Sequence, residues 1–147
     1  MRLFRAMETS TSALTAERLR MDLIANNLAN INTTRTENGE PYRRKFAVQA
    51  ERRDSFADLL GRQVNQSTAD AGEGVRVVSI ETDQAEFKQK YDPSHPDADA
   101  NGMVRLPNID LVQEMTDLMM AQRVYEANVS AFNASKLMTQ KALEIGR

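Results

Sequence analysis

The sequence predicts an α+β protein in which long N- and C-terminal helices pair as an antiparallel, coiled-coil-like inner domain, with a small β-rich middle domain. Three observations support this fold class. Apolar residues recur at spacings of three and four at both ends, turn residues and short β-branched runs fill the middle, and 147 residues leave room for one compact unit. We divide the chain into residues 1–32 (N-terminal helix), 33–107 (middle domain with a short helix) and 108–147 (C-terminal helix).

The first helix is expected over residues 2–31. Its apolar ladder follows a seven-residue repeat and is interrupted only at Ser10 and Glu17. The hydroxyl-rich residues 9–12 have low helix propensity, so we expect a kink or a frayed segment there. Asn30 favours the left-handed backbone that often ends a helix, so the helix should stop near it.

The middle domain alternates turn residues with short runs of β-branched and aromatic residues. The first run alternates in polarity and places Tyr42, Phe46 and Val48 on one face of a strand. A short helix is expected over 55–64, where apolar residues have helical spacing. The predicted strands are residues 42–50, 75–80, 87–91 and 103–106.

The last helix is predicted to begin after Pro107 and to continue to Ile145, because proline cannot continue a central strand. Asn108 can cap the helix, and Asp110 suits its positive end. About 38 helical residues would form a rod near 57 Å long.

Two apolar ladders run along this last helix. One includes Leu118, Tyr125 and Phe132, and the other follows a neighbouring face with Met120, Val124, Ala127, Ala131, Ala134 and Met138. Two faces predict two sets of neighbours, because a soluble monomer rarely leaves a long apolar stripe exposed. The alternative is that the middle domain packs onto the second face.

These ladders, together with asparagines that could fix the register between packed helices, define a predicted helix and subunit interface. Its residues in the first helix are Leu14, Met21, Ile24, Asn27, Leu28, Asn30 and Ile31. Its residues in the last helix are Met115, Leu118, Tyr125, Asn128, Val129, Phe132, Asn133, Ala134 and Met138.

Catalytic chemistry has little support in the sequence. The chain has no cysteine and a single histidine, and it lacks a phosphate-binding Gly-Lys-Ser/Thr loop. The run Asp92 to Asp99 contains carboxylates and the histidine, which could hold a divalent cation, but its two prolines and small polar residues favour a rigid surface loop. We predict no enzyme, no metal, no cofactor and no small-molecule substrate.

Charge and hydropathy limit the possible partners. The net charge is −2 and forms no basic stripe, so nucleic acid is not an expected partner. No apolar run approaches the ~18 residues that span a bilayer, and the N-terminal residues lack the continuous apolar stretch of a cleavable secretory signal. We therefore expect any export from the cytoplasm to use another route.

Residues 12–21 (SALTAERLRM) and 25–33 (ANNLANINT) resemble the N-terminal signature of bacterial flagellar rod and hook proteins. Three further stretches look like the proximal-rod branch of that family, and the resemblance covers essentially the whole chain. They are 41–45 (PYRRK), 91–99 (YDPSHPDAD) and 125–134 (YEANVSAFNA), the last leading to 141–146 (KALEIG).

The resemblance implies a structural subunit of the flagellar basal body. In this family the terminal helices pair, subunits stack helically with copies of themselves and other rod proteins into a hollow axial rod, and the rod transmits torque across the periplasm towards the hook. It also implies export through the flagellar type III apparatus without a cleavable signal peptide. The runner-up from another class is a cytoplasmic helical adaptor or export chaperone that binds client helices.

Overall fold

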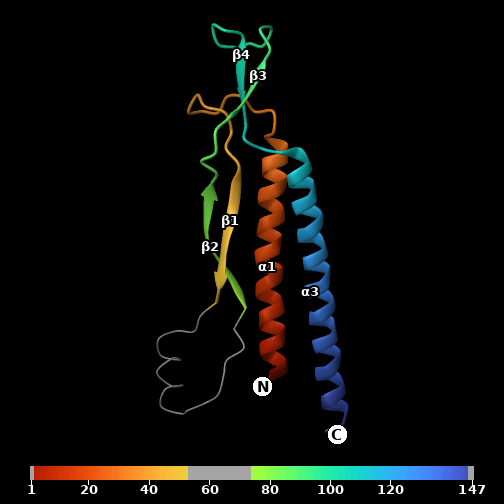
Figure 1. Cartoon of the computed structure of the whole chain (residues 1–147). Helices are drawn as coiled ribbons and strands as arrows, with labels where there is room; N and C mark the ends of the chain where they lie inside the picture. The colour runs from red at the N-terminus through yellow and green to blue at the C-terminus, as the bar shows by residue number, and fades with distance from the viewer. Residues whose placement is uncertain (1, 53–73, 146–147) are drawn as a thin grey trace, which may run out of the picture.

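The computed structural model describes residues 2–52 and 74–145. Its largest elements are α1 (Arg2–Ala29) and α3 (Leu111–Ile145), which lie side by side and run in opposite directions (Figure 1). The 35 residues of α3 give a rod of about 52 Å. The predicted α+β class and both long helices are confirmed, and each helix end lies within a few residues of its expected position.

The kink or frayed segment expected in the first helix is wrong, because α1 runs straight and unbroken through residues 9–12 (Figure 1). The hydroxyl groups there donate to backbone carbonyls about one turn earlier: Thr9 Oγ1 to Arg5 O at 2.9 Å and Thr11 Oγ1 to Met7 O at 2.8 Å. This local bonding lets threonine remain inside a helix despite its low propensity.

Two antiparallel hairpins make up the described part of the middle segment (Figure 1). Strand β1 (Lys45–Glu51) pairs with β2 (Val75–Thr82), from Lys45↔Thr82 to Glu51↔Val75, with an irregularity between Val48 and Gln49. Strand β3 (Lys88–Tyr91) pairs with β4 (Met103–Leu106), from Lys88↔Leu106 to Tyr91↔Met103. The four predicted strands are present, whereas the short helix expected over 55–64 lies outside the described residues.

The first strand begins later than predicted, so Tyr42 does not share its face with Phe46 and Val48. Tyr42 precedes the strand, and its hydroxyl donates to Asn27 Oδ1 of α1 at 3.2 Å. A long-range hydrogen bond that the local pattern could not reveal therefore decides where this side chain points.

Both strands of the first hairpin pack against α1, and among the described elements neither packs against α3. The alternative in which the middle domain covers the second face of the last helix is therefore wrong for the described residues. The buried apolar side chains are correspondingly few and dispersed: Ala16, Leu23 and Ile24 in α1, Val104 in β4, Ile109 before α3, and Ala121 within it.

The far end of the first hairpin contacts α1 closely. Ser12 Oγ accepts from Val75 N at 3.1 Å, and a Cβ added to Gly74 would lie 2.2 Å from that oxygen. Gly74 has a φ of +108°, which favours glycine for a second, independent reason. Arg52 N donates to Gly74 O at 2.9 Å, so the two chain ends of the hairpin are joined directly.

Asp110, rather than Asn108, caps the last helix. Asp110 Oδ1 accepts from Val112 N at 2.9 Å and from Gln113 N at 3.2 Å. These backbone donors lower the pKa of the Asp110 carboxyl below its ordinary value. Asn108 instead accepts from Arg44 N at 3.1 Å, because it lies beside the segment that enters β1.

Candidate assembly interface

One side of α3 faces α1 along the length of the helix pair. Ala121 is completely buried there, and Leu118, Tyr125 and Phe132 are half-buried. On α1, Ile24 is 5% exposed, and Glu17, which interrupts the apolar ladder, is also buried. The contact between the helices is thus a narrow seam whose larger side chains keep part of their surface in solvent.

The predicted interface residues divide into three groups by exposure. Ile24 and Asn27 are buried. Half-buried are Leu14, Met21, Leu28, Asn30, Ile31, Leu118, Tyr125, Asn128, Val129 and Phe132. Exposed are Met115, Asn133, Ala134 and Met138.

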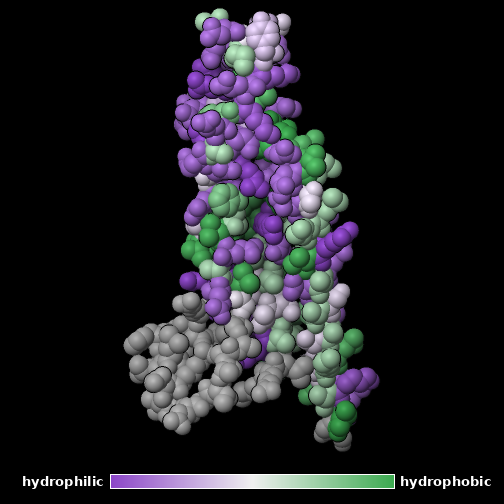
Figure 2. Space-filling view, in the orientation of Figure 1, coloured by the Kyte–Doolittle hydropathy of each residue, from purple (hydrophilic) through white to green (hydrophobic). Residues whose placement is uncertain are grey.

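The second face of α3, which we define as Met120, Val124, Ala127, Ala131, Ala134 and Met138, lies beside the face that meets α1 and is exposed throughout. Figure 2 shows hydrophobic residues following α3 from end to end. Met120 is 53% exposed and Met138 is 62% exposed. Burying such a stripe would contribute roughly 25 cal/mol per Å² of apolar surface, so the stripe is suited to packing against another molecule.

The last turns of α3 also lack a neighbour within the described chain. Every residue from 140 to 145 is exposed, including Leu143 at 71% and Ile145 at 86%. In Figure 1 this end of α3 reaches beyond the start of α1. Among the described residues, no helix is long and apolar enough to cross a membrane.

A cluster of buried polar groups lies at the opposite end of the helix pair. Glu114 of α3 is fully buried, and Asn27 of α1 is 1% exposed. Asn27 Nδ2 donates to Glu114 Oε2 at 3.1 Å and to Lys45 O at 2.9 Å, while Asn27 Oδ1 accepts from Lys45 N at 2.9 Å. Arg44 Nε donates to the other oxygen of Glu114. We call Asn27, Tyr42, Arg44, Glu114 and Asp117 the Glu114 cluster.

Electrostatics within this cluster affect its tyrosine. Burial, followed by the negative charge of Glu114, raises the pKa of the Tyr42 hydroxyl above its ordinary value. The proton is therefore retained, and the hydroxyl remains a donor to Asn27. Arg44 also reaches Asp117, with 3.4 Å between Arg44 Nη2 and Asp117 Oδ2.

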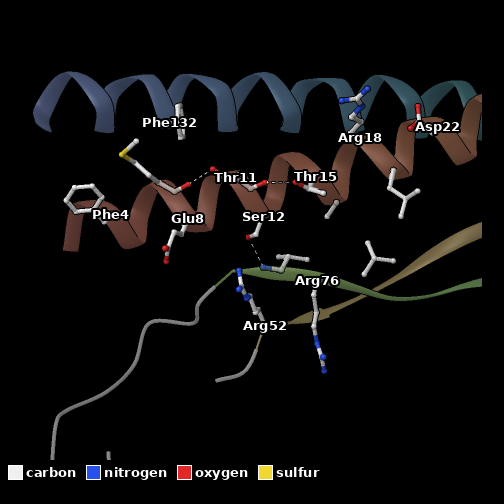
Figure 3. A pocket seen from close by; sticks show the side chains of 15 residues that line it. Phe4, Glu8, Thr11, Ser12, Thr15, Arg18, Asp22, Arg52, Arg76 and Phe132 are labelled. Atoms are coloured by element: carbon white, nitrogen blue, oxygen red, sulfur yellow. Dashed lines mark hydrogen bonds between the residues drawn. The ribbon is translucent and has the colours of Figure 1, made fainter. Parts of the chain in front are cut away.

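An open groove of about 960 Å³ lies between α1 and the first hairpin. Figure 3 shows Phe4, Ser12 and Phe132 around it, with Arg52 and Arg76 on the hairpin side. Its lining is largely apolar and includes Met7, Leu19 and Val77. This groove separates part of the sheet from α1, although Ser12 bridges the two.

The Asp92 to Asp99 loop uses its polar groups for internal contacts. Asp97 Oδ2 accepts from Thr34 Oγ1 at 2.7 Å, and Asp97 N donates to His95 Nδ1 at 3.1 Å. Within residues 2–52 and 74–145 there is no group of three histidine or acidic side chains placed to hold a metal ion. That the loop binds no metal stays a prediction.

Sequence reasoning missed Glu114 and Arg44. A signal for Glu114 was present: it lies four residues before Leu118 and seven before Ala121, and therefore on the helix face that meets α1. No comparable signal existed for Arg44, because its position depends on the path of the chain after α1.

Comparison with known proteins matches both helical ends to flagellar families. The family described as "Flagella basal body rod protein" matches residues 7–35, and "Flagellar basal body rod FlgEFG protein C-terminal" matches residues 100–145. The chain is 49% identical over 148 residues to the flagellar basal-body rod protein FlgC of Bacillus subtilis (strain 168), covering 98% of each chain.

Two further relatives extend the match across distant bacteria. The FlgC protein of Borreliella burgdorferi is 44% identical, covering 99% of this chain and 98% of its own. That of Salmonella typhimurium is 38% identical and covers 100% of both chains. The adaptor or chaperone interpretation has no counterpart in these names. The chain belongs to the flagellar basal-body rod protein FlgC family and is a structural subunit of the basal-body rod.

Proposed function

We propose that this subunit assembles through the second face and the exposed end of α3, which pack against other rod proteins and further copies of the chain in a helical array. The observation that carries the proposal is that α3 has one face against α1 and a second apolar face exposed over most of its length. A contact between unlike surfaces builds an open helical filament when its rotation does not close into a ring.

The role of the assembled chain is mechanical. Paired helices form the inner part of a hollow axial rod, which transmits torque from the motor towards the hook, and neither turnover nor a cofactor is involved. Support comes from the rod-protein names of the relatives and from the described part of the chain, in which two long helices carry two small hairpins.

The rod subunit acts in the periplasm. It reaches that compartment through the flagellar type III export apparatus. Support comes from the names of the relatives, which are flagellar basal-body rod proteins.

The assembly proposal is tested by placing charges on the second face of α3. Val124→Lys together with Ala131→Lys should leave the monomer folded, because both side chains are exposed, yet abolish rod formation, because each lysine would be buried without a partner. Motility and electron micrographs of basal bodies are the measurements, in cells whose own copy of the gene has been deleted.

The matched control is Gln122→Lys together with Glu126→Lys, which adds lysines at exposed polar positions of the same helix. Secreted protein is assayed in parallel, so that failed export is distinguished from failed assembly. Complete rods and hooks built from the Val124 and Ala131 variant would refute a buried second face.

A further inference from the structure

We propose that Glu114 is a junction that couples docking of α3 on α1 to the position of the β1–β2 hairpin. This inference concerns the internal mechanics of the chain and does not depend on how subunits pack in the rod. It begins with the fact that the partners of the Glu114 carboxylate come from two other parts of the chain.

The carboxylate of Glu114 is fully enclosed. A buried charge is strongly destabilising unless both oxygens are hydrogen-bonded, and here each oxygen has one donor. Asn27 supplies one from α1, and Arg44 supplies the other from the segment that enters β1. Three parts of the chain must therefore be in place together before this charge is compensated.

Arg44 and Lys45 connect that charge to the hairpin. Lys45, the first residue of β1, has its backbone N–H and C=O both bonded to the Asn27 side chain. Arg44, immediately before it, binds α3 through its side chain and Asn108 through its backbone N–H. At the start of the hairpin, α1 thus holds Lys45, whereas α3 and the residue Asn108 that precedes it hold Arg44.

A movement of α3 relative to α1 would separate Glu114 from Asn27, and these two side chains together hold the start of β1. The effect is reciprocal, since displacing Arg44 leaves Glu114 with an uncompensated oxygen and destabilises the first turns of α3. Beyond its first residues, the hairpin contacts only α1 among the described elements. The Glu114 cluster is therefore the place where α3 can influence the position of the hairpin.

The test is amide hydrogen exchange on the full chain, because exchange reports local opening of each element separately. Glu114→Gln keeps the side-chain shape but removes the charge. It should speed exchange at least about tenfold in the first turns of α3 and also at Phe46 to Val48 in β1. Arg44→Met, a change outside α3, should speed exchange at residues 114–121 of α3.

Glu126→Gln is the matched control, since Glu126 is an exposed glutamate on the same helix. Its exchange should equal that of the wild type. The Glu114→Gln and Arg44→Met double variant should open much less than the product of the two single effects, because the second change removes a bond that is already broken.

Three results would overturn the proposal: a Glu114→Gln effect confined to α3, multiplicative effects in the double variant, or first turns of α3 that exchange freely in the wild type. If Glu114→Gln prevents folding, Asp117→Asn is used in its place. That change weakens the longer contact to Arg44, together with the contacts of Asp117 to Arg20 of α1 and to Gln113. It should give the same pattern at smaller amplitude, and an effect absent from β1 would again refute coupling.

Discussion

At the scale of single residues, close backbone approach and helix capping determine which residues are hardest to substitute. Gly74 allows β2 to touch α1, and Asp110 satisfies the first amide groups of α3. Glu17 is a different case: it is buried, its Oε2 has no hydrogen-bond partner in the described structure, and Arg20 Nη1 lies 3.9 Å away.

Gly74→Ala should destabilise the chain by about 1–3 kcal/mol, because the new methyl group would both clash with Ser12 and impose a strained φ. Urea unfolding followed by circular dichroism measures the change. Gly39→Ala is the control, since Gly39 has a φ of +78° but no atom within 4 Å of the added Cβ. Equal losses in the two variants would mean that the contact with Ser12 contributes nothing.

The charge of Asp110 should stabilise α3 in a pH-dependent way. Its folded pKa is lowered, so the contribution is fully present above the unfolded value of about 3.9 and is lost as the pH falls through the folded pKa. Asp110→Asn retains a capping oxygen without the charge. The melting temperatures of wild type and variant should differ at pH 7 and converge as the pH falls below about 3.9; a difference independent of pH would exclude the charge as its cause.

At the scale of elements, the spacing of residue types predicted the helices and strands, because these elements depend on the local sequence. Apolar periodicity located both long helices, and short runs of β-branched or aromatic residues between turns located the four described strands, because these signals are present within each segment. The fold around Tyr42 and Arg44 could not be predicted in this way, since both side chains are positioned by residues of α1 and α3 far away in sequence. The capping residue of α3 was misassigned for the same reason: Asn108 is occupied by Arg44.

Phe132→Ala should weaken the pairing of α1 and α3 by about 1–3 kcal/mol. This is less than the 3–5 kcal/mol typical of a fully buried phenylalanine, because Phe132 keeps part of its surface in solvent. Thermal and urea unfolding measure it. Val112→Ala, at a side chain that is 73% exposed on the same helix, should change stability by no more than about 0.5 kcal/mol. If the two variants matched, Phe132 would not belong to the seam.

At the scale of the whole molecule, the described chain has more apolar helix surface than its own elements cover. The β1–β2 hairpin lies along α1, so α3 keeps a long exposed side and an exposed end. Sequence periodicity indicated that two faces existed, but it could not say which of them the chain would cover itself. That choice follows from the contacts of residues 44 and 45 with Asn27 and Glu114.

Truncation after Asn108 should abolish motility, because it removes α3 and leaves the apolar side of α1 without its partner. We expect basal bodies that lack a complete rod and hook, with motility restored by the intact chain. The truncated protein must be found outside the cytoplasm for the result to concern assembly. Normal hooks on cells that carry only the truncated form would exclude α3 from the rod.

The hydrogen bond between Arg52 and Gly74 has a practical consequence for engineering. The bond joins the outgoing and returning chain ends at one point. The entropic cost of closing the connection between them therefore depends only weakly on the length of that connection. A fluorescent or affinity tag grafted between these two residues would leave from the end of the hairpin opposite the Glu114 cluster. The subunit could then be followed while it is incorporated.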